Sequence, residues 1–476
     1  MNTNEEFWAR VSNYKKLGLD PLRWVAGCAV KVDLTTVIYP ALHMIKPELE
    51  KLGVTINPRE DADIFPLRED EIIVKRAIYD FKEPRVDTQW LADLSPTRAL
   101  SLVQVHQKHA GNPEEFGNQL TEVYKRLSEA NIKFTVGKGH SIISPYPDDE
   151  FALFEFVREG TGRPSGFTLA NNDTIQVIDP MDDPGSQSQA FVAISNALND
   201  LIALGCFENL RAYPVYDAPS DEMVKAIEGN MKQFSQQHNV RIEDTGPLRR
   251  GRLLIGASVI GDMYKQPPTH YDFLTPGMQI LVTRAFGDLA PINTYLSCVA
   301  DEDYLNKLEQ SGHSLEDVRK AKESAIKVMM EPNLRIGQII NGLCPEFGDK
   351  FKENEHVAAT GDLSGPGIYI FKELADIAKA EITLDKIPLA FPEYVKFATE
   401  SYLMDNGTAG TNGAIAMIAS EEVIKSAISS LERQGHRPQI IGQIIRRGEP
   451  KLIVPKEVEN FIASKSILNE MTIAHS

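Results

Sequence analysis

Residues 189–205 read QAFVAISNALNDLIALG and carry the strongest helical pattern in the chain. Asn196 and Asp200, four residues apart, share one face of the expected helix. Gly205 stands where a helix commonly ends, because glycine accepts the left-handed backbone of that position. The apolar residues recur at intervals of three and four and form the opposite face, which is expected to pack on a core: Ala190, Phe191, Ile194, Ala197, Leu198, Leu201 and Ile202.

The sequence on either side of this helix alternates between strand-like and helix-like segments. A strand-like run at 174–178 leads into the turn DPMDDP at 179–184. At 476 residues the chain is long enough for two or more subdomains, and the alternation indicates an α+β or mixed α/β class. Periodicity predicts these further elements: strands at 253–260, 279–283 and 414–419, and helices at 221–236, 314–330, 373–380 and 421–434.

The bulk composition is that of a soluble globular protein, with 42% hydrophobic and 25% charged residues. No apolar run is long enough to span a bilayer, and residues 1–16 lack the apolar core of a signal peptide. We therefore expect a cytoplasmic protein with no membrane partner. The net charge of −17 argues against a nucleic-acid partner, because neutralising many phosphates requires clustered Lys and Arg.

The four cysteines are widely scattered, with no zinc-binding spacing and no sign of a disulfide framework. We expect three of them, Cys206, Cys298 and Cys344, to be small buried side chains. Cys28 has different neighbours. Gly27 gives its backbone freedom, and Lys31 follows three residues later and would favour the thiolate.

Four short motifs occur in an order that resembles a known family. They are Ala26-Gly27-Cys28-Ala29-Val30-Lys31, Arg59-Glu60-Asp61-Ala62, Asn196-Ala197-Leu198-Asn199-Asp200 and Gly361-Asp362-Leu363-Ser364-Gly365-Pro366-Gly367. Together they resemble the motifs of selenophosphate synthetase and, more broadly, of the aminoimidazole-ribonucleotide synthetase superfamily. Softer matches lie at 276–283 and 407–413, so the resemblance covers most of the chain except roughly 68–165.

The resemblance implies an enzyme that consumes ATP, selenide and water and gives selenophosphate, AMP and orthophosphate. By this resemblance Cys28 and Lys31 are catalytic: Cys28 handles the selenium or sulfur donor, and Lys31 supplies a positive charge to the transferred phosphate. Lys31, Asp179 and Asn196 are the implied nucleotide contacts. The implied ligands of Mg²⁺, which prefers carboxylate oxygens, are Asp61, Asp200 and Asp362.

The resemblance also implies a two-subdomain fold of the aminoimidazole-ribonucleotide synthetase type, with mixed sheets, helices packed on one face, and a homodimer formed through the N-terminal sheets. We expect residues 1–67 to hold the Cys/Lys loop and the start of the ATP-binding domain. Residues 68–165 would be an insertion atypical of the family, and 166–285 the rest of the ATP- and metal-binding domain. Residues 286–476 would form the C-terminal α/β domain.

Some features depart from the family pattern. The sequence Gly137-Lys138-Gly139-His140-Ser141 resembles the family's Gly-Gly-His-Ser loop, but it precedes the 189–205 helix instead of following it. It is either a displaced phosphate loop or an ordinary turn. Val30 stands where the family often has a second Cys, and Gly361 stands where it has a Thr. The sequence therefore leaves open whether the substrate is selenide or sulfide. Two other hypotheses therefore stay open: a synthetase of the same superfamily that activates an amide or carbonyl and gives ADP, and a non-catalytic nucleotide-binding regulator.

Overall fold

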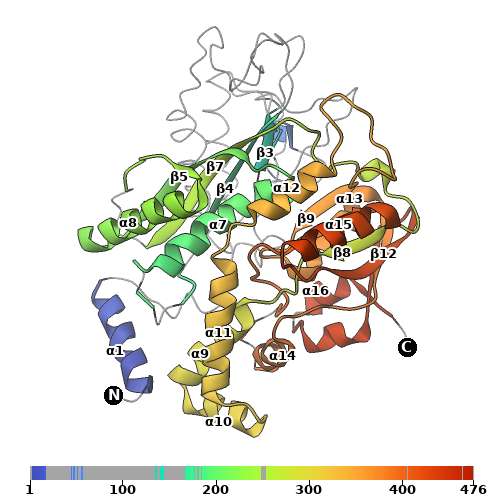
Figure 1. Cartoon of the computed structure of the whole chain (residues 1–476). Helices are drawn as coiled ribbons and strands as arrows, with labels where there is room; N and C mark the ends of the chain where they lie inside the picture. The colour runs from blue at the N-terminus through green and yellow to red at the C-terminus, as the bar shows by residue number, and fades with distance from the viewer. Residues whose placement is uncertain are drawn as a thin grey trace.

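The computed structural model describes residues 3–17, 44, 47–48, 51, 55–56, 135–136, 140–143, 167–175, 177–179, 182–183, 185–247, 253–401, 403–404, 406–463 and 465–474. Two main sheets organise this part of the chain (Figure 1). Both sheets are mixed and both are combined with helices, which confirms the α+β class expected from the sequence. None of the described helices is both long enough and apolar enough to cross a membrane.

The first sheet has five strands, and all neighbouring strands are antiparallel except the last two. Helix α7 (Gln187–Ala203) packs on β4 and β7 of this sheet, whose bounds follow, and α8 (Asp221–His238) lies beside α7 (Figure 1). Across the sheet the strands are β3 (His140–Ile143), β4 (Phe167–Ile175), β7 (Leu254–Met263), β5 (Glu208–Asp217) and β6 (Arg241–Ile242).

The second sheet has seven strands and is formed entirely by the C-terminal part of the chain. Its parallel pairs are β10 with β13 and β13 with β14. In order the strands are β14 (Thr472–Ile473), β13 (Lys451–Val454), β10 (Ala380–Leu384), β12 (Gln439–Arg447), β8 (Gln279–Val282), β11 (Ile415–Ala419) and β9 (Ala359–Asp362).

Alternate residues of β11 enter two different cores, so helices cover both faces of this sheet. Ala416 and Ile418 pack with α13 (Ile370–Ala378), whereas Ile415 and Met417 pack with α15 (Glu421–Arg433). This is a fuller cover than the one-sided arrangement expected from the sequence. It follows from the strand itself, because all five residues of β11 are buried and apolar.

The remaining helices lie beside and below the two sheets (Figure 1). Helix α9 packs against α1, α10, α11 and α14. A separate two-stranded parallel pair joins β1 (Thr55–Ile56) to β2 (Thr135–Val136). The helices are α1 (Thr3–Lys16), α9 (Leu289–Ala300), α10 (Glu302–Gln310), α11 (Leu315–Met329), α12 (Leu334–Gly342), α14 (Pro392–Glu400) and α16 (Lys465–Asn469), with short 3₁₀ turns η4 (Tyr271–Phe273), η5 (Gly367–Tyr369) and η6 (Lys456–Asn460).

Helix α7 connects the two sheets. The Ser186 side chain caps the N-terminus of α7 by accepting a hydrogen bond from the backbone N of Gln189. Gly205, with φ +85°, follows the C-terminus of the helix, as the sequence predicts. The apolar side chains of α7 other than Val192 share one core with β4, β7, β8 and β11. The helix also contacts β9, α11 and α12. It therefore sets the position of each sheet relative to the other.

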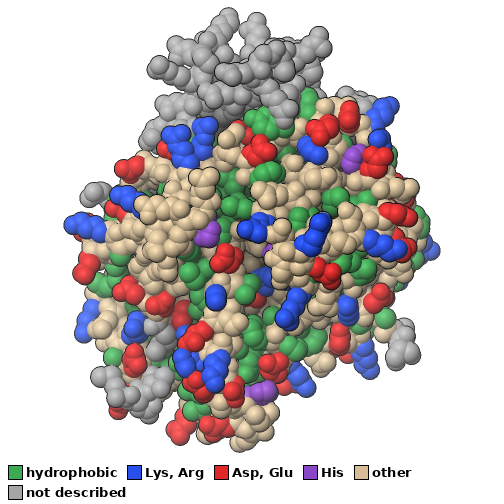
Figure 2. All heavy atoms as spheres, viewed as in Figure 1, with side chains coloured by type: hydrophobic (Ala, Val, Ile, Leu, Met, Phe, Trp, Pro, Cys, Tyr) green, Lys and Arg blue, Asp and Glu red, His purple; other side chains and the backbone are tan. Residues whose placement is uncertain are grey.

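Charged side chains of both signs are interspersed over the face shown in Figure 2. Exposed helix surfaces contribute to this mixture through short-range ion pairs, such as Arg319 of α11 with Glu316 and Glu323. The face in view therefore presents no extended basic area of the kind that a nucleic-acid backbone requires.

Gly256 of β7 is expected to be essential to the pairing of β4 with β7. A Cβ added to Gly256 would lie 2.2 Å from the Asp173 carbonyl oxygen and 2.5 Å from the Thr174 Cα, both backbone atoms of β4. Gly256→Ala should lower the free energy of unfolding by about 2–3 kcal/mol, as overpacking does. Gly229→Ala in α8 is the control: apart from its chain neighbours and the backbone of its own helix, no atom lies within 4 Å of the added Cβ, so it should raise stability by about 0.5–1 kcal/mol. Urea denaturation measures both, and equal effects of the two substitutions would contradict the expectation.

Candidate functional site

Four of the site residues expected from the sequence lie in the described part of the chain: Asp179, Asn196, Asp200 and Asp362. Cys28, Lys31 and Asp61 lie outside the described residues, as do Gly137, Lys138 and Gly139. The structure places the four described residues on a loop, on helix α7 and at the end of strand β9.

Asn196 and Asp200 face strand β4 from helix α7. The Asn196 amide Nδ2 donates to Asp173 Oδ2 at 2.5 Å. On the strand, the Asn171 amide Nδ2 donates to Asp200 Oδ2 and, at 3.1 Å, to the Ala197 carbonyl oxygen. Two carboxylates and two carboxamides therefore form one cluster between β4 and α7.

The geometry of this cluster follows from the two backbone repeats. Residues 171 and 173 are two apart on a strand, so their side chains leave the same face. Residues 196 and 200 are four apart on a helix, so they also share a face. Because Asn171 bonds Asp200 and Asn196 bonds Asp173, the two carboxylates occupy diagonal corners of the cluster. Asn171 is 1% exposed, whereas the other three are half-buried.

Asp173 and Asn171 were not identified from the sequence. The sequence contains a signal for them: Leu169, Asn171 and Asp173 lie two residues apart, and a spacing of two places side chains on one face of a strand. The expected strand began at 174, whereas β4 runs from Phe167 to Ile175, so both residues were left outside it. Polar Asn-Asn-Asp sequences are also common in turns, which hides such a strand.

Asp362 ends strand β9 and orders the turn that follows. Its Oδ1 accepts hydrogen bonds from the Ser364 backbone N at 3.0 Å and from Ser364 Oγ at 2.8 Å. Gly365 and Gly367 have φ of +83° and +58°. A Cβ on Gly367 would lie 2.4 Å from Thr408 Oγ1, so the glycine permits a close approach of two loops. Since α7 contacts β9, Asp362 lies at the end of a strand that packs against the helix bearing Asp200.

The donor set of these positions fits a hard divalent cation. Asp173, Asp200 and Asp362 offer carboxylate oxygens, which Mg²⁺ prefers, and asparagine amides orient the first two. Within the residues described, no group of three His, Cys, Asp or Glu side chains converges closely enough to hold a metal ion. A complete site would therefore combine these carboxylates with further donors from the substrate phosphates, water or other parts of the chain.

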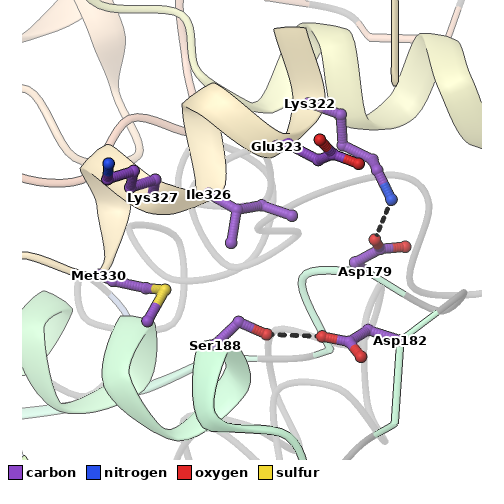
Figure 3. Close-up of a pocket in the computed structure, with 8 residues that line it drawn as sticks. All are labelled: Asp179, Asp182, Ser188, Lys322, Glu323, Ile326, Lys327 and Met330. Atoms are coloured by element: carbon purple, nitrogen blue, oxygen red, sulfur yellow. Dashed lines mark hydrogen bonds and ion pairs between the residues drawn. The ribbon is translucent and has the colours of Figure 1, made fainter. Parts of the chain in front are cut away.

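Asp179 lies in a different environment, at the wall of a cavity of about 310 Å³ between α11 and the segment that precedes α7 (Figure 3). Its carboxylate accepts from the buried Lys322 ammonium, which also lies 4.6 Å from the Tyr295 ring centroid. Burial and the charge of Asp179 raise the pKa of Tyr295. Ser188 Oγ donates to Asp182 at 2.7 Å across the same cavity. The other lining residues are Glu323, Ile326, Lys327 and Met330.

The three described cysteines are buried, as the sequence predicts. Burial raises the pKa of the Cys298 thiol to about 12 and also raises the pKa of the Cys206 and Cys344 thiols. A thiol with so high a pKa is protonated at neutral pH and is a poor nucleophile. These three residues are therefore core side chains and carry no thiolate chemistry.

No family model matches the chain. Among curated proteins the chain is similar to the selenide, water dikinase of Methanocaldococcus jannaschii, with 22% identity over 304 residues, which are 62% of this chain and 82% of that protein. This similarity confirms the resemblance indicated by the motifs. Solved structures that align with this chain include thiamine-monophosphate kinase from Stenotrophomonas maltophilia. The two are 16% identical, the alignment covers 68% of this chain and 99% of that one, and the TM-score is 0.44. Another is the hydrogenase maturation protein HypE from E. coli, which is 17% identical, with an alignment that covers 65% of this chain and 88% of that one and a TM-score of 0.43.

The ion pair between Lys322 and Asp179 is expected to be important for stability. Lys322→Met should lower the free energy of unfolding by about 3–5 kcal/mol, because it leaves a buried carboxylate without its cation. Arg319→Met on the same helix is the control, since its ion pairs are exposed and should contribute little. Urea denaturation distinguishes the two. If Lys322→Met unfolds at the same urea concentration as Arg319→Met, the buried pair is not a stabilising element.

Proposed function

We propose that this chain is an ATP- and Mg²⁺-dependent phosphotransferase that activates reduced selenium as selenophosphate, or sulfur as thiophosphate, and gives AMP and phosphate. The observation that carries the proposal is the cluster between β4 and α7 in which Asp173 and Asp200 are each oriented by an asparagine of the other element. The similarity to a selenide, water dikinase supports the choice of reaction. Cleavage of a triphosphate requires cations at its oxygens, and this cluster supplies carboxylates that can hold them.

In this proposal the carboxylates bind the cations that accompany ATP. Asp173, Asp200 and Asp362 would hold Mg²⁺, together with Asp61 from the N-terminal part of the chain. When bound, Mg²⁺ would neutralise negative charge on the phosphate oxygens. Asn196 contributes by orienting Asp173 through its hydrogen bond, and Asn171 does the same for Asp200. Such partners fix the direction in which a carboxylate presents its lone pairs.

The remaining roles fall to the other residues expected from the sequence. We assign to Lys31 the stabilisation of negative charge on the transferred phosphate, and to Cys28 the handling of the reduced chalcogen as a thiolate. Asp179 would contact the nucleotide from the cavity beside α11, where Lys322 fixes its carboxylate. We further propose that two copies of the chain associate through the five-stranded sheets.

Phosphorus NMR of the purified protein with Mg²⁺ and ATP, under anaerobic conditions, tests the reaction. Selenide, sulfide or neither is added in parallel samples. AMP together with a new selenophosphate or thiophosphate resonance is the expected result, and the productive donor identifies the chalcogen. ADP alone would favour a synthetase that activates an amide or carbonyl, and tight ATP binding without turnover would favour a regulator. Cys28→Ser should abolish chalcogen-dependent turnover, and full activity of that variant would reject the role of Cys28.

Loss of either carboxylate in the β4–α7 cluster should stop turnover without unfolding the chain. Asp173→Asn and Asp200→Asn keep the size of the side chain and remove its charge. We expect kcat/KM for ATP to fall by more than about 100-fold, because the loss of an outer partner of a metal ligand alone costs roughly 10–100-fold. Asp376→Asn is the control, since that residue forms an exposed ion pair with Lys372 on α13 and should leave turnover unchanged. Wild-type rates in both cluster variants would remove the basis for placing the metal here.

A further inference from the structure

Asn199, next to Asp200 in the chain, is fully buried in the middle of α7. A carboxamide in such a place must satisfy its donor and acceptor within the protein. Its Nδ2 donates to Asn412 Oδ1 at 2.6 Å, and its Oδ1 accepts from Asn333 Nδ2 at 3.0 Å. Both partners belong to the C-terminal part of the chain. Asn199 therefore attaches the helix that bears Asp200 to a loop more than 200 residues away in sequence.

Asn412 is held from several sides. Its Nδ2 donates to the Met329 carbonyl oxygen at the end of α11, and its backbone N donates to Asp288 Oδ2 at 3.4 Å. Its carbonyl oxygen accepts from Arg284, whose guanidinium forms a two-pronged ion pair with Asp288 at 2.6 and 3.1 Å. The Asn412 side chain is 1% exposed. Its position is thus determined by groups on three different elements.

The next residue, Gly413, continues the connection to Asp362. Its backbone N donates to Ser364 Oγ at 3.4 Å, and the same hydroxyl donates to Asp362 Oδ1 at 2.8 Å. Gly413 has φ +80°, and a Cβ there would lie 1.9 Å from Asn333 Nδ2. The glycine is required because the loop passes so close to the amides that bind α7.

These contacts form a continuous route between Asp200 and Asp362, two carboxylates that the family resemblance places in one metal site. We propose that Asn412 is a positioning residue: through Asn199 it fixes α7, and through Gly413 and Ser364 it fixes Asp362. The distance between Asp200 and Asp362 is thereby set before any ligand binds. This inference rests on the proposed function, because it assigns the two carboxylates to a shared cation site.

A purely structural role for the route makes a different prediction. An apolar side chain of similar volume at position 412 would fill the same space without needing partners, and such replacements are often tolerated. If Asn412 only supports the fold, its loss lowers stability and leaves cation affinity alone. If it positions the carboxylates, cation affinity falls as well, because a metal site depends on ligand spacing within a fraction of an ångström.

The probe is Mn²⁺ alone, whose binding to the full chain is measured by electron paramagnetic resonance without nucleotide. Asn412→Ala and the smaller change Ser364→Ala should each raise the Kd for Mn²⁺ by about tenfold. The double variant Asn199→Ala/Asn412→Ala should bind Mn²⁺ no more weakly than Asn412→Ala, because both changes break the same route. The Mg²⁺ concentration that half-activates ATP turnover should rise in parallel, while kcat at saturating Mg²⁺ changes less.

Asn341→Ala is the matched control. The Asn341 amide Nδ2 donates to the Gly205 carbonyl oxygen at 3.0 Å, so it also ties α12 to the α7 region, but this bond is not part of the route to Asp362. This variant should lose stability in thermal unfolding and keep the wild-type Kd for Mn²⁺. The proposal is overturned if Asn412→Ala and Ser364→Ala lose stability like Asn341→Ala but bind Mn²⁺ as the wild type does. A wild-type chain that binds no Mn²⁺ would instead overturn the metal site itself, and the inference with it.

Discussion

The structure depends on the burial of helix α7 between two sheets. Of its 17 residues, 13 are buried, including Ser195 and Asn199, whose side chains bond to the C-terminal part of the chain. A helix surrounded in this way cannot move without breaking contacts on every side, because protein interiors are packed at the density of organic crystals. The five-stranded sheet, the seven-stranded sheet and helices α11 and α12 all take their positions from this helix.

Burial on nearly all sides also explains why the polar residues of α7 have such specific partners. Gln189 Oε1 accepts from the Ile178 backbone N at 2.8 Å, Ser195 Oγ donates to the Met330 carbonyl oxygen at 2.8 Å, and Asn199 bonds two further amides. A buried donor without a partner would cost about 1–3 kcal/mol. Each polar side chain of α7 therefore selects one arrangement of its neighbours.

The sequence predicted this helix well and its surroundings only partly. Periodicity identified residues 189–205, and the structure has Gln187–Ala203. The pattern indicated one apolar face, whereas the helix is buried almost all round, because alanine and serine on its second face pack as closely as leucine. Small residues carry a weak hydrophobic signal, so a second buried face cannot be recognised from one sequence.

The reach of local sequence patterns separates the candidate site residues that were predicted from those that were missed. Asp200 and Asp362 stand in local patterns, a helix face and a glycine-rich turn, which short stretches of sequence reveal. Asp173 and Asn412 become meaningful only through partners 23 and 213 residues away. Pairing over such distances is decided by the packing of the sheets on α7, and no local propensity encodes it.

The contacts of the carboxylates distinguish two kinds of acidic residue in this fold. Asp179 accepts from Lys322 and Asp288 from Arg284, so a cation of the protein itself neutralises each of these buried charges. Asp173 and Asp200 accept from the amides of Asn196 and Asn171, which orient a carboxylate and add no positive charge to it. The lysine and arginine partners thus neutralise Asp179 and Asp288, whereas the asparagine partners of Asp173 and Asp200 fix the direction of the carboxylate.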